Sequence, residues 1–104
     1  MSGWEPTVGE YGRRIWTPAD PVVKTADGVP ITHGMRVFTN NLDRGVIDLL
    51  DEVRPATYEW HGPENRWVLW FEVRCFENYK GEASTSSVLQ SHDRVARRFN
   101  GKEA

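Results

Sequence analysis

The sequence predicts a small all-β domain, and three features of its composition support this fold class. The 104 residues suffice for one domain, and 38% hydrophobic and 27% charged residues are close to globular averages. Five Trp, four Phe and three Tyr favour strands, and their large rings can close a small core. Nine Gly and six Pro recur at short intervals and interrupt most potential helices. We therefore expect a single β-rich domain.

The stretch 66–76 is the clearest predicted strand. Its odd-numbered residues are all apolar, namely Trp67, Leu69, Phe71, Val73 and Cys75. Its even-numbered residues are mixed. Because successive side chains of a strand point to opposite faces, the odd-numbered set should be buried. We accordingly expect Phe71 in the core and Glu72 in solvent, where its substitution would cost little.

Two turns place further strands beside this one. The β-prone run 57–61 precedes the turn-rich tetrad Gly62-Pro63-Glu64-Asn65, which predicts a hairpin. After the central strand, the polar turn 78–82 leads into 84–89. These segments predict a three-stranded meander.

A second hairpin is predicted upstream. Apolar and polar residues alternate over 34–39, a polar turn follows at 40–45, and 46–50 resumes a β-prone run. Gly45 ends the turn, where we expect a positive φ.

The ends of the chain are less regular. Residues 1–20 contain frequent Gly and Pro and predict an irregular arm preceding a single domain over 21–104. The segment 22–31 predicts a short extended entry with a turn at Asp27-Gly28. For 91–99 we expect a 3₁₀ or helical turn that continues into a short strand, since Ser91 or Asp93 can act as an N-cap.

About five short strands are suited to a small SH3-like barrel, whose closure would remove exposed sheet edges. The stretch 27–47 resembles the opening of small uncharacterised proteins of actinobacteriophages and their hosts, and 70–73 and 92–99 are similar to later blocks of the same group. The likeness covers 27–99. Within it, 34–47 also resembles the KOW motif of ribosome and transcription factors. The resemblance implies an SH3-like fold and a phage setting, and it transfers no functional residue.

Nothing in the sequence predicts an enzyme or a cofactor. Cys75, the single cysteine, lies on the apolar side of the central strand and should be an inert core residue. His33, His61 and His92 are far apart and lack metal-ligand spacing, so we expect no metal. His61 and Glu64 straddle a turn and should form a solvated pair. A glycine-rich phosphate loop is also absent.

Two segments of opposite charge stand out. Segment 43–52 has a net charge of −3 from Asp43, Asp48, Asp51 and Glu52 with Arg44 counted. A solvated face is the favoured interpretation, and an acid/base pair or a divalent-cation site is the alternative.

The tail 92–102 has a net charge of +3. If 94–98 were a helical turn, Arg94, Arg97 and Arg98 would share one face and could clamp a phosphate or a carboxylate. The alternative is a charged surface that balances segment 43–52.

The mixed side of the central strand is the third candidate site, and it comprises Arg66, Trp70, Arg74 and Phe76. One interpretation is that the arm covers this side through Trp4, Tyr11 or Trp16. A protein partner is the second, because Trp and Arg are enriched at interface hot spots. The third is a nucleic acid, because aromatic rings stack on unpaired bases.

From these observations we expect a non-catalytic binding module, an accessory protein of a phage that engages a protein partner or self-associates. The net charge of −2 lacks the electropositivity of a strong DNA binder. RNA or single-stranded DNA binding is the alternative, and a structural or virion-assembly role is the third. The N-terminus has no basic and apolar signal pattern, so we expect the cytoplasm of a bacterial host cell and no membrane contact.

Overall fold

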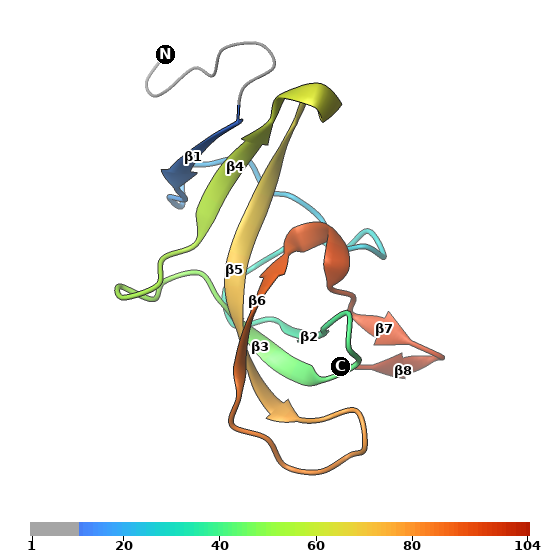
Figure 1. The fold of residues 1–104 in the computed structure, drawn as a ribbon. Helices are drawn as coiled ribbons and strands as arrows, with labels where there is room; N and C mark the ends of the chain where they lie inside the picture. Colours follow the sequence, from blue (N-terminus) through green and yellow to red (C-terminus); the bar gives the residue numbers. More distant parts are fainter. Residues whose placement is uncertain (1–10) are drawn as a thin grey trace.

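The computed structural model describes residues 11–104, with Tyr11 described by its backbone only. The prediction of an all-β fold is confirmed: the described residues form an antiparallel six-stranded sheet and a separate two-stranded hairpin (Figure 1). The strands are β1 (Tyr11–Ile15), β2 (Arg36–Phe38), β3 (Arg44–Asp48), β4 (Thr57–His61), β5 (Arg66–Glu77), β6 (Ser87–Ser91), β7 (Arg98–Phe99) and β8 (Lys102–Glu103). Two 3₁₀ turns, η1 (Gly62–Glu64) and η2 (His92–Arg94), complete the described structure, and no helix in it is long and apolar enough to cross a membrane.

The long strand β5 organises the sheet. Trp70 pairs with Thr57 of β4 and with Ser91 of β6, whereas Val73 pairs with β3 and with β6. Because a strand has only two edges, β3 and β4 must follow one another along one edge of β5, while β6 occupies the other. The loop 49–56 joins β3 to β4, so the two strands run along β5 like one strand that this loop interrupts.

The core lies on one side of β5, as its alternation predicts. Leu69, Phe71, Val73 and Cys75 are buried in the main hydrophobic cluster, against which Trp67 is partly buried. We call this side the inner face, and the side of the even-numbered residues the outer face.

The expectation for Glu72 is wrong. Glu72 is only 6% exposed, and its carboxylate accepts a hydrogen bond from Arg54 Nη1 at 3.0 Å. The alternation of β5 placed Glu72 on the outer face correctly. It did not reveal that other side chains cover that part of the face.

The expectation for Gly45 is also wrong. Both strands of the predicted 34–50 hairpin are present as β2 and β3, but the positive φ of their turn belongs to Leu42, at 66°. Gly45 lies within β3 next to a register shift against β5. A Cβ atom there would lie 2.5 Å from Val73 Cγ1 and 2.8 Å from the Arg74 carbonyl oxygen. Close approach of two strands therefore requires this glycine.

The described strands form an open sheet rather than a closed barrel. The chain after η2 rejoins β2 through a single bridge, in which Phe38 and Ala96 exchange backbone hydrogen bonds of 2.7 and 3.1 Å. The predicted turn followed by a short strand is present as η2 and β7. The β7–β8 hairpin was not predicted, although Asn100-Gly101, with φ of 50° and 77°, is a strong two-residue hairpin sequence.

The prediction of an irregular arm over 1–20 is wrong for Tyr11–Ile15, which form β1 against β4. Trp16 follows, and it packs against the main core cluster instead of covering the outer face. Trp4 and the side chain of Tyr11, also predicted to cover that face, lie outside the described residues.

Arg14 fastens β1 to the segment that follows it. Its guanidinium lies over the rings of Tyr58 and Trp67, at 5.2 and 5.5 Å from their centroids. It also donates two hydrogen bonds, of 2.8 and 2.6 Å, to the Asp20 carboxylate. The Arg14 guanidinium, together with the Thr17 backbone N–H, holds the pKa of Asp20 below its ordinary value.

Replacement of Asp20 by Asn should therefore lower the free energy of unfolding at pH 7 by about 2 kcal/mol, the scale of a charge-assisted hydrogen bond. A lowered pKa in the folded state means that this stabilisation is present above the ordinary value of 3.8 and is lost as the pH falls through the folded pKa. Urea denaturation at several pH values would show the wild type and Asp20→Asn converging in acid. The exposed Glu52→Gln is the control, and a constant difference between wild type and Asp20→Asn would contradict the prediction.

Candidate functional site

A groove of about 420 Å³ lies on the outer face around Trp70. This volume is within the range of pockets that hold a small ligand or an anchoring side chain. In the sheet register, Ile15, Thr57 and Trp70 form one row across β1, β4 and β5. Leu89 of β6 lines the groove beside Trp70 and is 62% exposed. The floor is thus largely apolar.

Two ion pairs border the groove. Arg13 Nη2 lies 3.1 Å from Glu59 Oε2, and Arg54 Nη1 lies 3.0 Å from Glu72 Oε1. The two arginine side chains are 68% and 72% exposed, whereas those of Glu59 and Glu72 are 22% and 8% exposed. The guanidinium groups therefore remain accessible to the polar groups of a bound molecule, while the carboxylates are largely covered.

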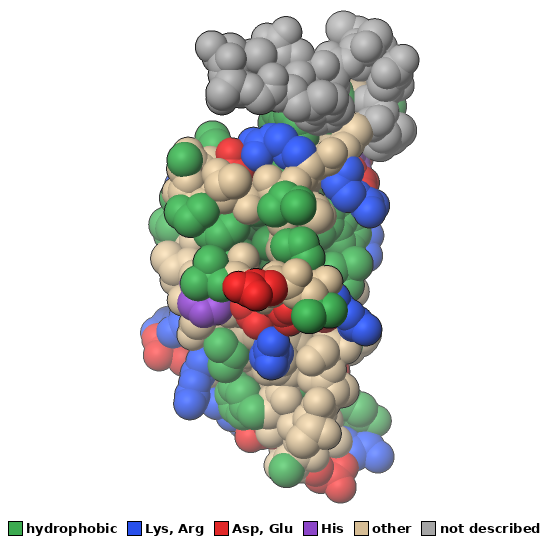
Figure 2. Space-filling model, turned by 90° about the vertical axis from the view of Figure 1, so that its left-hand side faces the viewer, with side chains coloured by type: hydrophobic (Ala, Val, Ile, Leu, Met, Phe, Trp, Pro, Cys, Tyr) green, Lys and Arg blue, Asp and Glu red, His purple; other side chains and the backbone are tan. Residues whose placement is uncertain are grey.

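The loop 49–56 positions Arg54 at this border. Asp51 Oδ1 accepts the backbone N–H groups of Val53 and Arg54, and these hydrogen bonds lower the pKa of Asp51. Figure 2 shows the side of the molecule that carries this loop, with acidic side chains gathered near its middle and hydrophobic side chains around them. Leu50 and Val53 are among the exposed hydrophobic residues. The loop therefore presents apolar and charged groups together next to the groove.

The indole N–H of Trp70 has no structural role that the described residues explain. Its Nε1 atom is buried and has no hydrogen-bond partner within residues 11–104. A buried donor without a partner costs stability. Phenylalanine would avoid this cost, but its smaller ring would leave part of the space of the indole unfilled.

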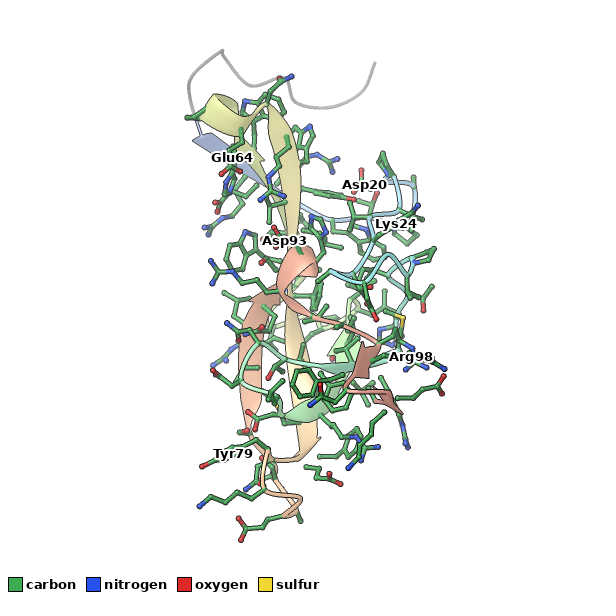
Figure 3. All side chains as sticks on the ribbon, turned by 90° about the vertical axis from the view of Figure 1, so that its right-hand side faces the viewer. Asp20, Lys24, Glu64, Tyr79, Asp93 and Arg98 are labelled. Carbon is green, nitrogen blue, oxygen red and sulfur yellow. The ribbon has the colours of Figure 1, made fainter. Side chains whose placement is uncertain are left out.

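Arg66, Trp70, Arg74 and Phe76 do share the outer face of β5, but ion pairs neutralise both arginines. Arg66 donates to Glu64 at 2.7 Å and to Asp93 at 2.9 Å, and Figure 3 shows these two acids one above the other beside β5. Arg74 donates to Asp48 and Asp51 at 3.0 and 2.9 Å.

Phe76 lies apart from the groove. The guanidinium groups of Arg36 and Arg44 lie 5.0 and 5.3 Å from the centroid of its ring. Cation–π contacts thus already occupy the ring. Of the four predicted residues on this face, the groove contains only Trp70.

The predicted arginine face of the tail is wrong, because η2 ends at Arg94 and the chain is extended from Val95. Arg97 Nη1 donates to the carbonyl oxygen of Arg36 at 2.6 Å, and Arg98 pairs with Glu103 at 2.9 Å. Arg94 is exposed and has no ion pair within residues 11–104. The three arginines therefore do not form one clamp.

The acidic segment 43–52 is engaged in structural contacts rather than arranged as a metal site. Asp48 and Asp51 hold Arg74, and Asp43 accepts the backbone N–H of Tyr79 at 3.1 Å. No group of three His, Cys, Asp or Glu residues suited to a metal ion occurs in the described part of the chain. His61 lies near Glu64, at 3.6 Å, and nearer to Glu59, at 2.8 Å.

Cys75 is buried, as the alternation predicts. Burial raises the pKa of its thiol, although Ser86 opposes this effect. A raised pKa leaves little of the reactive thiolate at neutral pH.

Sequence reasoning missed Arg13, Arg54 and Leu89, which complete the groove around Trp70. They come from β1, the loop 49–56 and β6. No local pattern links these segments, because their proximity depends on the pairing of four strands. Comparison with protein-family models, curated proteins and solved structures gave no match for the chain. The geometry of the groove is therefore the principal basis for a functional proposal.

Proposed function

We propose that the chain is a non-catalytic binding module and that the groove around Trp70 receives an apolar side chain of a protein partner. The observation that carries this proposal is an aromatic and apolar floor between two exposed arginines, Arg13 and Arg54. Trp and Arg are the residue types that contribute most often to interface hot spots. Ile15 and Leu89, 60% and 62% exposed, extend the apolar surface on either side of the groove.

The ion pairs favour a protein over a nucleic acid at this face. Arg66 and Arg74 each contact two carboxylates, and Glu59 and Glu72 lie at the groove itself. A phosphate backbone would meet these acids and would have to compete for the arginines. A protein partner can place both positive and negative side chains around an apolar centre and so pair with both kinds of charge.

We further propose that β2, β3, β5, β6, η2 and the bridge at Ala96 correspond to an SH3-like arrangement, with the bridge in the place of a closing strand. In that view β1 and β4 are an addition that extends the sheet along β5 and forms one wall of the groove. The proposed setting, an accessory protein of a bacteriophage in the bacterial cytoplasm, rests on the sequence resemblance alone.

Replacement of Trp70 by Ala should weaken partner binding by about thirtyfold, the loss of a typical hot-spot residue. The measurement is capture of proteins from an actinobacterial lysate by the immobilised full-length chain, with and without nuclease. We expect one captured protein that resists nuclease treatment, depends on Trp70 and is retained by Arg94→Ala, an exposed arginine away from the groove.

Trp70→Phe keeps an aromatic ring in the floor and removes the unpaired N–H together with part of the indole ring. Loss of the unpaired donor and loss of buried ring area act in opposite directions on the melting temperature, which should therefore change less than in Trp70→Ala. Binding that survives in Trp70→Phe shows that the partner does not need the N–H. Capture that disappears with nuclease would favour the nucleic-acid alternative. Capture unaffected by Trp70→Ala, with the fold verified by circular dichroism, would contradict the proposed site.

A further inference from the structure

The free edge of β6 is the one long unprotected sheet edge in the described structure. β6 pairs only with β5 among the described strands (Figure 1). The edge of β2 that does not pair with β3 is bridged to Ala96 at Phe38. The strand at the other end of the sheet, β1, carries two charged residues, Arg13 and Arg14. Natural proteins usually block such edges with charges, proline or a covering segment.

The hydrogen bonds to β5 show which backbone groups of this edge face solvent. Ser84 N–H donates to the Phe76 carbonyl oxygen at 3.1 Å, and Cys75 N–H donates to the Ser86 carbonyl oxygen at 2.9 Å. Even-numbered residues therefore bond to β5. By the alternation of an antiparallel strand, the backbone groups of Thr85, Ser87 and Leu89 point away from it. The Leu89 carbonyl oxygen accepts a hydrogen bond of 3.1 Å from Gln90 Nε2 and keeps one lone pair for a further donor.

The composition of this edge contains none of the usual blocking residues. From Ala83 to Ser91 the chain has no charged residue and no proline. Thr85, Ser87 and Leu89 are all exposed. The side chains of Ser87 and Leu89 lie on the outer face, opposite Arg74 and Glu72 of β5.

We propose that this edge pairs with the same edge of a second copy of the chain, antiparallel and centred on Ser87. This register places Ser87 opposite Ser87 and Thr85 opposite Leu89, so no like charges meet across the junction. The nearest charges, those of Arg74 and Glu72, are already paired within each copy. The low net charge of −2 adds little repulsion between copies. The contact uses the backbone edge of β6, whereas the Trp70 groove uses the Leu89 side chain on the outer face of the same strand. It gives the protein a property beyond the proposed binding, namely self-association through a continuous sheet.

Sedimentation equilibrium of the full-length chain tests the proposal over about 10–200 µM, the range expected for a small interface. The wild type should reach the dimer mass within this range. Ser87→Lys should remain monomeric because it places two like charges opposite each other. Thr32→Lys adds the same charge at another exposed position and should dimerise like the wild type.

Cysteine cross-linking tests the register. In the proposed pairing the two Ser87 Cα atoms lie about 5.5 Å apart, within the range that a disulfide spans. Oxidised Ser87→Cys should therefore form a covalent dimer, whereas Thr85→Cys, which faces Leu89, should form far less.

Three outcomes would each overturn the proposal: a wild type that stays monomeric at all concentrations, a Ser87→Lys variant that still dimerises, or a monomer that captures a foreign chain at β6. Loss of dimerisation in Ser87→Lys without loss of Trp70-dependent capture would separate it from the proposed groove function.

Discussion

Truncation of Phe71 to Ala should lower the free energy of unfolding by about 3–5 kcal/mol, the range measured for large aromatic residues in cores. Phe71 is 1% exposed and lies in the main hydrophobic cluster at the centre of β5. Its removal takes away buried apolar area and leaves a cavity. The neighbouring strands are hydrogen-bonded into one sheet, so they cannot easily move to close it. For a small domain this is a large share of the total stability.

Chemical denaturation of wild type and Phe71→Ala measures this change. Phe99→Ala is the matched control, because Phe99 is 42% exposed and contacts Phe38 at a ring-centroid distance of 6.1 Å. The control should cost well under half as much, since a large part of that residue is already in water. Equal losses for Phe71→Ala and Phe99→Ala would show that the inner face of β5 is not the core.

Replacement of Gly45 by Ala should cost about 3 kcal/mol, toward the upper end of the range for overpacking. A Cβ atom would lie 2.5 Å from Val73 Cγ1 and 2.8 Å from the Arg74 carbonyl oxygen. A side-chain atom can move, but the carbonyl oxygen belongs to the backbone of β5. The two strands must therefore separate locally.

A double-mutant cycle with Val73→Ala identifies the cause. Removal of Val73 Cγ1 relieves the first of the two contacts, so Gly45→Ala should cost less in the Val73→Ala background. The contact with the Arg74 carbonyl oxygen remains, and part of the cost should persist. An identical cost in both backgrounds would mean that the clash with Val73 is not what destabilises the variant.

Much of the fold is predictable from local patterns. The alternation over 66–76 identifies β5 and its buried side, because the pleat fixes the period of a strand. The tetrad 62–65 identifies the turn into β5, where Asn65 adopts a φ of 52°. The β7–β8 hairpin is an exception, since it was not predicted although its Asn100-Gly101 turn is a local hairpin signal.

The candidate site was only partly predictable. Trp70 is recognisable as an aromatic residue on the exposed side of a strand. Its neighbours Arg13 and Leu89 are far from it in sequence, and the pairing of β1 and β6 with the rest of the sheet brings them to the groove. The binding roles predicted for Arg66 and Arg74 ignored the acids that reach them from η1, η2 and the loop 49–56.

The sequence by itself determined the all-β class, the central strand with its buried side, and most of the turns. These features depend on the steric preferences of single residues and on alternation over a few neighbours, which operate at short range. The tertiary structure alone decided that β3 and β4 share one edge of β5, that Gly45 must admit a neighbouring backbone, and that Glu72 is covered. Each of these depends on which distant segments meet. Such contacts are determined by the packing of the whole chain, where burial and charge pairing across strands outweigh the local preferences of single residues.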